Sequence, residues 1–412
     1  MPNKHTSLRE MAKRYAEIIN SPEQQARRLA WARHNSFDFR GPLIYIRAVP
    51  YWEFFDYSGI GSTNPLLAGI EREMAELVQY HNTLCDDTTY EPWIAVPARF
   101  TDEVTPKWGV PCKLGERNTQ YGAAAFEPVI REEGDFSLLR ASSRIIDEEA
   151  TKRDFDIVND AIGDILDVVV DRKGLFCGIW AGDISTDLAK LRGLEEIMWD
   201  AYDNPDFLHK LCGFMRDAIL ADMDQTEQNG NFSLFNNQNQ AMPYAMELAM
   251  PDSKTTNVRL NEIWGFMSSQ EFTTFSPAMF DEFMLSYQKP IMEKYGLTAY
   301  GCCEDLTKKI DVLKKIKNLR RIAVSPFANV RECAERIGKD YVVSYRPNPS
   351  MIAMGLDEAY VKDVLRKDFA AFKDNGSIFD VTLKDVETIA GKPANMLRWV
   401  ELVREVDTEV FG

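Results

Sequence analysis

Residues 297–350 contain three short apolar runs, at 297–302, 321–325 and 341–345. Their sequence is LTAYGCCEDLTKKIDVLKKIKNLRRIAVSPFANVRECAERIGKDYVVSYRPNPS. Two stretches with helical spacing of apolar residues separate these runs. The runs are nearly continuous rather than alternating, which is typical of parallel strands that are covered on both faces. The stretch therefore predicts a repeated strand–helix unit.

The same pattern continues outward along the chain. Further apolar runs lie at 43–49, 93–98, 175–180, 263–267 and 377–381. Eight such runs alternating with helical patterns predict an α/β protein with a (β/α)₈ TIM barrel.

The N-terminal part and one internal stretch do not follow the repeat. Residues 7–35 read as helix, divided where Ser21 and Pro22 mark a helix start. Residues 99–155 are rich in Gly, Pro and charge and do not fit the repeat. We expect N-terminal helices over 1–40 and one barrel domain over 41–412. An insertion at about 99–155 would cover the barrel mouth.

Composition narrows the class of protein. The 412 residues include 48 Lys and Arg against 64 Asp and Glu, so the formal net charge is −16. Such a chain repels phosphate backbones, which disfavours nucleic acid as a partner. No run of apolar residues is long enough for a membrane span, and the N-terminus lacks an apolar signal core. We expect a cytoplasmic protein that does not bind membranes.

Thiols outnumber imidazoles, because the chain has seven cysteines and four histidines. The odd count and the adjacent pair Cys302–Cys303 fit reduced thiols better than a disulfide framework. A metal site in this chain would depend on Cys, Asp or Glu.

In a barrel of this kind the site lies at the carboxyl ends of the strands. There Cys302, Cys303 and Glu304 crowd one strand-to-helix turn. Zn²⁺ prefers thiolates and accepts a carboxylate. Adjacent side chains of a strand point to opposite faces, so one thiol as ligand and one in the wall is the favoured arrangement. The alternative is that both thiols are small buried hydrophobes.

Other strand ends carry polar side chains, each with a structural alternative. Gln270 and Glu271 follow one strand and would bind substrate or a metal, or else cap a helix. Arg346, with Asn348 nearby, would bind an anion, or else belongs to a proline-fixed turn. Asp385 and Glu387 follow the last strand and would be functional, or else form a solvated helix start.

Aromatic side chains at other strand ends suit a flat organic substrate, although large rings more often fill a core. They are Tyr51, Trp52, Trp93, Trp180 and Phe266. The sequence has no dinucleotide-binding glycine motif, phosphate-binding loop, HExxH or GxSxG.

The order of segments from residue 268 to 350 resembles the uroporphyrinogen decarboxylase superfamily. The shared features are the SPxxFxxF helix, a glycine–cysteine strand end, the ERIG helix end and an Asn-Pro strand end. Upstream, LRGLEEIMWDAYDNPDFLHKL looks like the helix pair of that family. The resemblance covers residues 160–405 well and the first 160 weakly, and it implies a (β/α)₈ barrel.

The resemblance implies one of two activities: metal-free decarboxylation of uroporphyrinogen, or zinc-dependent methyl transfer involving a corrinoid protein or a thiol. Decarboxylases of the family carry two arginines in a loop near the first strand. Here Arg47 matches and the second arginine is missing, which disfavours decarboxylation. The thiol-directed methyltransferases carry His-x-Cys where this chain has Tyr300-Gly301-Cys302, so the histidine is missing too.

Because the second arginine and the histidine are missing, the chain resembles the divergent corrinoid-linked branch of the superfamily more closely. This branch is the O-demethylase methyltransferase I type. Its implied activity is zinc-dependent transfer of a methyl group from a small methoxylated or methylated compound to a corrinoid protein, which carries cobalamin and docks in trans. The implied metal ligands are Cys302 first, then Cys303 and Glu304, with Glu387 as a further carboxylate.

The remaining candidate residues divide into two groups. We expect Glu271, Arg346 and Asp385 to be catalytic. The expected substrate-binding residues are Arg47, Tyr51, Trp93, Trp180, Phe266, Gln270 and Asn348. Members of the resembled family are often dimers, so the resemblance allows a homodimer. The alternatives are a metal-free decarboxylase or lyase that clamps carboxylates with Arg47 and Arg346, and a non-catalytic barrel that binds a small ligand.

Overall fold

The structure is a computed structural model, and it describes residues 6–47, 49–102, 106–116, 125–142, 144–353 and 355–412. The long helices are α1 (Thr6–Ile19), α2 (Pro22–Asn35), α3 (Pro65–Thr83), α4 (Glu148–Ile162), α5 (Ser185–Arg192), α6 (Leu194–Asp203), α7 (Pro205–Gln228), α11 (Val330–Ile337), α13 (Glu358–Asp374) and α14 (Ala394–Phe411). Short helices are α8 (Pro277–Phe280), α9 (Ser286–Met292), α10 (Ile310–Leu313) and α12 (Ser350–Ala353). A π-helical turn, Asp281–Leu285, joins α8 to α9.

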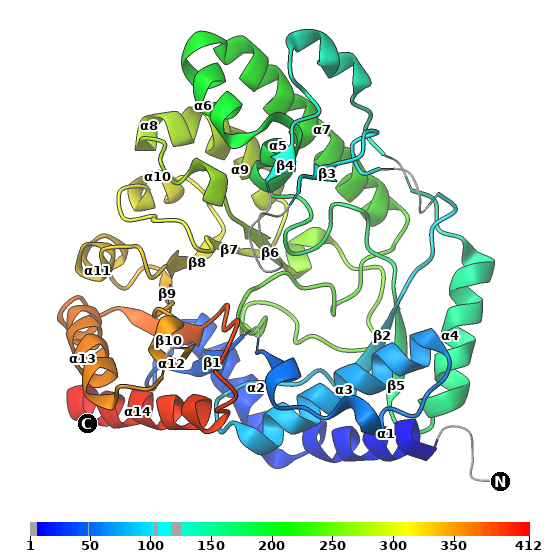
Figure 1. Cartoon of the computed structure of the whole chain (residues 1–412), viewed down its shortest axis with the longest axis vertical. Coiled ribbons are helices and arrows are strands. Elements are labelled where there is room, and N and C mark those ends of the chain that lie inside the picture. The colour runs from blue at the N-terminus through cyan, green and yellow to red at the C-terminus, as the bar shows by residue number, and fades with distance from the viewer. Residues whose placement is uncertain (1–5, 48, 103–105, 117–124, 143, 354) are drawn as a thin grey trace.

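Parallel strands form two sheets in the described part of the chain. A six-stranded sheet has the order β1-β10-β9-β8-β7-β6, and β2 pairs with β5. The strands are β1 (Ile44–Ile46), β2 (Trp93–Pro97), β5 (Asp167–Asp171), β6 (Trp264–Met267), β7 (Leu297–Tyr300), β8 (Leu319–Val324), β9 (Val342–Tyr345) and β10 (Ile378–Leu383). Figure 1 shows the six-stranded sheet curling inside the helices, with the β2–β5 pair across from it. The architecture is therefore α/β with a curved parallel sheet.

Seven of the eight expected strands are confirmed, and the run at 175–180 is not a strand. The strand of that repeat unit is β5, where Val168, Val169 and Val170 pair with β2. Valine is stiff at its first side-chain torsion and suits a pleated strand. The run LFCGIW instead contains Gly178 and ends at Trp180, whose φ of 67° belongs to a turn.

The predicted helix starts at Ser21, Ser276 and Asn329 are confirmed. Each of these side chains accepts a hydrogen bond from a backbone N–H two or three residues inside its helix. Within the expected insertion, β3 (Lys113–Leu114) and β4 (Phe126–Glu127) form a short antiparallel hairpin, and a 3₁₀ helix covers Glu133–Leu138. Helix α4 then begins at Glu148.

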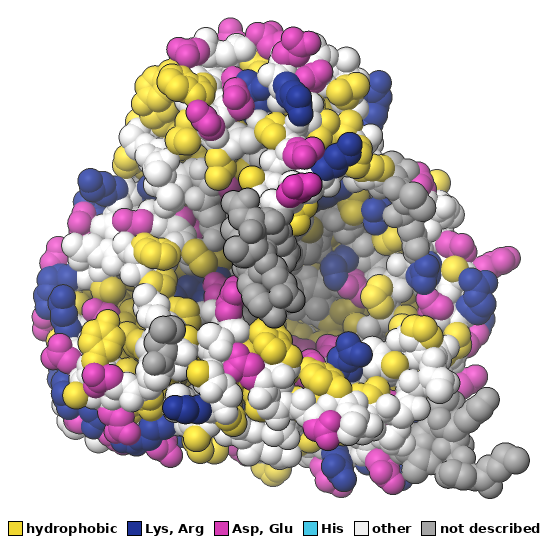
Figure 2. All heavy atoms as spheres, viewed as in Figure 1, with side chains coloured by type: hydrophobic (Ala, Val, Ile, Leu, Met, Phe, Trp, Pro, Cys, Tyr) yellow, Lys and Arg dark blue, Asp and Glu magenta, His cyan; other side chains and the backbone are white. Residues whose placement is uncertain are grey.

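Seen from outside, hydrophobic, acidic and basic side chains are mixed over the face drawn in Figure 2, which is hollowed near its centre. Among the described residues, no helix is long and apolar enough to cross a bilayer.

A buried polar network joins helix α2 to the inner face of the sheet. The Arg321 guanidinium of β8 donates to Asn35 Oδ1 at 2.6 Å and to Asp380 Oδ2 of β10 at 2.6 Å. Asn35 in turn donates to the carbonyl oxygens of Met242 and Tyr244. Arg321 and Asp380 are both buried, so the network fixes helix α2, two strands and a distant loop together.

We predict that Asp380→Ala lowers the free energy of unfolding by about 3–5 kcal/mol, because the substitution leaves the Arg321 charge buried without its partner. Urea denaturation followed by circular dichroism measures the change. The double variant Arg321→Met/Asp380→Leu should be more stable than the single variant, since no charge then remains buried alone. An equal loss of unfolding free energy in the single and the double variant would contradict this explanation.

Candidate functional site

Three cations occupy the first position after three neighbouring strands. Arg47 follows β1, Lys384 follows β10 and Arg346 follows β9, and these strands are adjacent in the sheet. Ile46 is in register with Leu383, which places Arg47 beside Lys384. Because parallel strands end at the same edge, the carboxyl end of this sheet carries a cluster of positive charge.

Two thiols face this cluster from the end of β7. The Lys384 ammonium lies 2.7 Å from Cys302 Sγ and 3.4 Å from Cys303 Sγ. The two sulfur atoms are 3.5 Å apart. Cys302 is buried and Cys303 is half-buried, so one sulfur lies inside the site and the other lies near its surface.

The surroundings favour a thiolate at Cys302. The hydrogen bond from the Cys303 thiol, together with the charges of Arg346 and Lys384, lowers the pKa of Cys302 to about 6 despite desolvation. The same sulfur–sulfur hydrogen bond raises the pKa of Cys303. Desolvation lowers the pKa of Lys384, but the contacts with the two sulfurs outweigh it and leave that pKa above its ordinary value. These shifts favour a Cys302 thiolate beside a protonated Lys384 at neutral pH.

Arg346 and Arg47 keep unused hydrogen-bonding capacity. Arg346 Nη1 donates to the Cys302 carbonyl oxygen at 2.7 Å. Arg346 Nε and Arg47 Nη1 are buried atoms with no hydrogen-bond partner in the part of the chain that the structure describes. Burial lowers the pKa of Arg346. Unpaired buried N–H groups are costly, and an anionic ligand would satisfy them.

Glu304 and Gly301 shape the turn that presents the thiols. Glu304 accepts hydrogen bonds from the backbone N–H groups of Ser269 at 2.9 Å and Cys302 at 2.7 Å, one at each oxygen. Gly301 has a φ of 102°, and a Cβ there would lie 2.9 Å from the Ala323 side chain. Only glycine fits this position without strain.

The four predicted metal ligands do not form one ligand set. Cys302 and Cys303 come together, but both Glu304 oxygens are already bound to backbone, and Glu387 is an exposed residue. The Lys384 ammonium is bound to both sulfurs, where an added cation would be repelled. Within the described ranges no three His, Cys, Asp or Glu side chains are grouped to hold a metal ion. These donors therefore do not fit the expected zinc site.

Asp385 does lie at the site. Cys303 Sγ is 3.4 Å from Asp385 Oδ2, and Lys384 Nζ is 3.0 Å from the same carboxylate. Its backbone φ of 59° is uncommon for a residue other than glycine. Asp385 balances part of the positive charge that surrounds the thiols.

Glu271 belongs to a second, neighbouring polar group. It accepts hydrogen bonds from Ser185 Oγ at 2.8 Å and Thr186 Oγ1 at 3.2 Å. Thr186 also donates to Asp183, which is buried. Desolvation, together with the charges of Glu271 and Asp187, raises the pKa of Asp183 to about 7. Asp183 is therefore a buried carboxyl group that can hold a proton near neutral pH.

Two of the predicted aromatic residues border the thiol site. The Trp180 and Phe266 rings are 5.0 Å apart and nearly perpendicular. Lys384 Nζ lies 5.8 Å from the Trp180 ring centroid, so the ammonium has sulfur on one side and an aromatic ring on another.

The other predicted residues lie elsewhere or have local partners. Trp93 begins β2, at the amino end, and contacts Phe235. Tyr51 packs against Phe54. Asn348 accepts a hydrogen bond from the Ser350 N–H, which supports its turn interpretation. Gln270 lines a hollow of about 490 Å³ together with Cys303, Glu304 and three neighbouring residues.

Lys384 and Asp183 are the residues that the sequence interpretation missed. Lys384 stands one position before Asp385, and the sequence interpretation assigns it no role. Alternation along 380–384 carries the missing signal, because Asp380, Thr382 and Lys384 share one face of β10. No comparable pattern marks Asp183.

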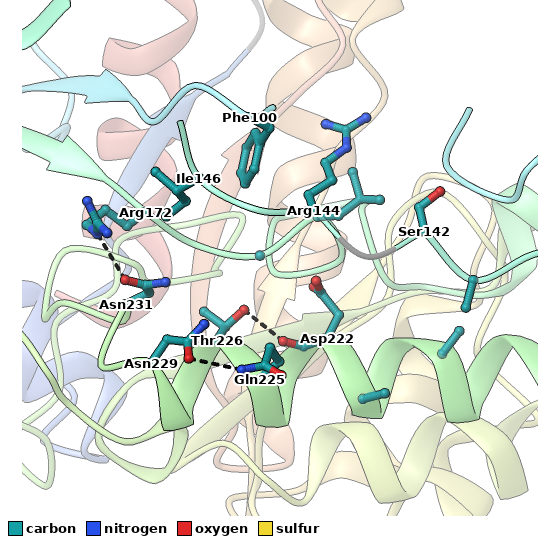
Figure 3. A pocket seen from close by; sticks show the side chains of 15 residues that line it. Phe100, Ser142, Arg144, Ile146, Arg172, Asp222, Gln225, Thr226, Asn229 and Asn231 are labelled. Carbon is teal, nitrogen blue, oxygen red and sulfur yellow. Dashed lines mark hydrogen bonds between the residues drawn. The ribbon is translucent and has the colours of Figure 1, made fainter. Parts of the chain in front are cut away.

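A separate cavity of about 190 Å³ lies beside helix α7 and is drawn in Figure 3. Arg144, Arg172 and Asp222 are among its lining residues. Arg172 Nε donates to Asn231 Oδ1 at 2.9 Å, and Asp222 accepts from the Phe176 N–H. None of the predicted site residues lines this cavity.

Comparison with known proteins finds similarity among solved structures but no sequence match. No family model matches the chain, and no curated protein matches it. Among solved structures, a methyltransferase from Methanosarcina mazei is similar over 93% of this chain and 98% of its own, with 12% identity and a TM-score of 0.49. A similarity of this strength assigns no activity to the chain.

We predict that iodoacetamide alkylates Cys302 with a pH midpoint of about 6. The thiolate is the reactive form, so the rate is high above this pH and falls as the pH drops through it. Lys384→Met should move the midpoint upward by about one pH unit or more, toward the ordinary thiol value of about 8.5. Peptide mass spectrometry of Cys302 after timed alkylation measures both.

The matched control is Lys392→Met, which removes a lysine from an exposed position. Its midpoint should equal that of the unmodified protein. A Lys384→Met midpoint equal to the control would show that the ammonium does not stabilise the thiolate.

Proposed function

We propose that this chain is a methyltransferase that removes a methyl group from a small anionic methoxylated or methylated compound. The observation that carries the proposal is the buried Lys384 ammonium, held by Cys302 and flanked by Arg47, Arg346 and the Trp180 ring. Cleavage of a methyl ether leaves a negative oxygen, and this site concentrates positive charge and a proton donor. We also propose that the strands around the site form a fully closed eight-stranded barrel.

The arginines account for the substrate class. A carboxylate on the substrate would satisfy the free N–H groups of Arg47 and Arg346, which no described residue satisfies. A planar ring attached to that carboxylate would pack against Trp180 and Phe266. Of the small methylated compounds, an aromatic carboxylate with a methoxy group matches both features.

Lys384 has the central role in the proposed chemistry. As the methyl carbon leaves the ether oxygen, Lys384 donates a proton to that oxygen, which prevents a free phenoxide or alkoxide from building up. The Cys302 thiolate holds the ammonium in place, and Arg346 adds electrostatic stabilisation of the developing charge. Lys384 is the proposed catalytic residue, and Cys302 is the residue that positions it.

The acceptor that we propose is a corrinoid protein that docks at the carboxyl end of the sheet. Its reduced corrinoid would provide the nucleophile for the methyl group. This part of the proposal rests on the family resemblance of the sequence. The zinc ion expected from that resemblance enters no step, because its four expected donors do not form one ligand set.

The test supplies reduced cobalamin, or a reduced corrinoid protein, and a panel of methoxybenzoates to the purified chain. Formation of methylcobalamin is followed by absorbance, and the phenol product by chromatography. We expect Lys384→Met to lower kcat by about 10²–10⁴-fold with little change in KM, as for loss of a general acid. Lys392→Met should leave both constants unchanged.

Arg47→Met should act differently from Lys384→Met. Loss of a carboxylate contact made equally in the ground and transition states raises KM without lowering kcat. We expect KM to rise about tenfold for a methoxybenzoate, in line with about 1.4 kcal/mol of lost binding. An equal KM for methoxybenzene and methoxybenzoate in the unmodified protein would exclude the proposed carboxylate contact.

Decarboxylation is the second candidate, and the paired unsatisfied N–H groups of Arg47 and Arg346 favour it. The same clamp would hold a carboxylate next to a proton donor in a reaction that releases carbon dioxide. Labelled carbon dioxide from a carboxyl-labelled substrate distinguishes the two candidates, because demethylation retains the carboxyl carbon. Release of label without methylcobalamin would replace the first proposal with the second.

A further inference from the structure

Cys302 and Cys303 are placed to react with each other. Their sulfur atoms are 3.5 Å apart, so a disulfide of about 2.05 Å requires them to approach by about 1.5 Å. The other five cysteines are distributed over the chain, and in the described residues none of them has a hydrogen bond to another cysteine. The pair at the end of β7 is therefore distinct from the remaining thiols.

The two thiols also differ in the way that oxidation chemistry requires. Cys302 is buried with its sulfur 2.7 Å from the Lys384 ammonium, whereas Cys303 is half-buried and its thiol donates to Asp385 Oδ2 at 3.4 Å. A thiolate attacks a peroxide, and a neighbouring thiol resolves the product. Cys303 lines the hollow of about 490 Å³ beside Gln270 and Phe327, which brings a small oxidant to the pair.

We propose that Cys302 and Cys303 form a reversible disulfide when the protein meets a hydroperoxide. The Cys302 sulfur attacks one peroxide oxygen, the O–O bond breaks, and the departing hydroxide takes a proton to become water. Cys303 then loses its proton and attacks the Cys302 sulfenic acid, whose hydroxyl leaves as a second water. The two sulfurs supply the two electrons that reduce one hydrogen peroxide to two waters.

This disulfide is readily reduced. Adjacent Cα atoms are about 3.8 Å apart across a trans peptide, whereas disulfides usually join Cα atoms about 4.4–6.8 Å apart. The resulting strain raises the reduction potential and makes the bond labile. A cellular dithiol is then sufficient to restore the thiols.

The disulfide would remove the counter-charge of Lys384. With Cys302 bonded to Cys303, no thiolate holds the ammonium, and Asp385 is the carboxylate that remains beside it. Loss of turnover on oxidation rests on the proposed function, whereas disulfide formation itself does not. Mass spectrometry therefore tests disulfide formation independently of any enzymatic activity.

The experiment treats the reduced full-length chain with hydrogen peroxide at neutral pH, alkylates it with iodoacetamide and digests it. We expect the peptide that contains Cys302 and Cys303 to lose the mass of two hydrogen atoms and to take up no label. After dithiothreitol the same peptide should take up two labels. A peptide that stays fully alkylated, or that carries only sulfinic or sulfonic acid, would overturn the proposal.

Variants make the assignment specific. In Cys303→Ser no resolving thiol is present, so dimedone should trap Cys302 as a sulfenic acid and sulfinic acid should accumulate. Cys112→Ser, at an exposed cysteine, should form the disulfide at the same rate as the unmodified chain. Disulfide formation that persists in Cys303→Ser would show that another cysteine is the partner and would refute the pairing.

A second probe needs no variant. Phenylarsine oxide binds two neighbouring thiols, and one equivalent should bind the reduced chain and protect both Cys302 and Cys303 from alkylation. Prior treatment with peroxide should abolish that binding, and dithiothreitol should restore it. Labelling of both cysteines in the presence of the arsenical would contradict the proposed pairing.

Discussion

The buried ion pair between Arg321 and Asp380 determines how the sheet presents its side chains. Neither charge reaches solvent, so the pair cannot separate without leaving a charge buried alone. Asp380 therefore fixes which face of β10 points inward. Because side chains alternate along a strand, Lys384 lies on the same face four residues later. A shift of one residue would turn Lys384 toward the helices and remove its ammonium from the two thiols.

The site combines opposite charges in an acidic protein. The chain carries a formal net charge of −16, yet Arg47, Arg346 and Lys384 converge at one sheet edge. Cys302, Asp385 and Glu304 offset that charge, so it is the unsatisfied N–H groups of Arg47 and Arg346 that favour an anionic ligand. The net negative charge of the chain repels polyanions, so the ligands expected at this site are small anions that can enter it.

Much of the fold follows from the sequence because buried parallel strands are nearly continuous apolar runs. LFCGIW shows the limit: it is as apolar as a strand, but its glycine and the turn at Trp180 prevent pairing, and the valines of β5 pair instead. At the site, Cys302 and Arg346 could be predicted from their strand-end positions. Local sequence does not reveal that Glu304 binds backbone N–H groups, since its two donors come from two different strand ends.

The double attachment of Glu304 has a mechanical consequence. By holding the backbone N–H groups of Ser269 and Cys302, it joins the loop after β6 to the loop after β7. Phe266 at the end of β6 and the thiols after β7 consequently keep a fixed spacing. Any ligand that needed a wider separation of these two loops would have to break at least one of the two Glu304 hydrogen bonds.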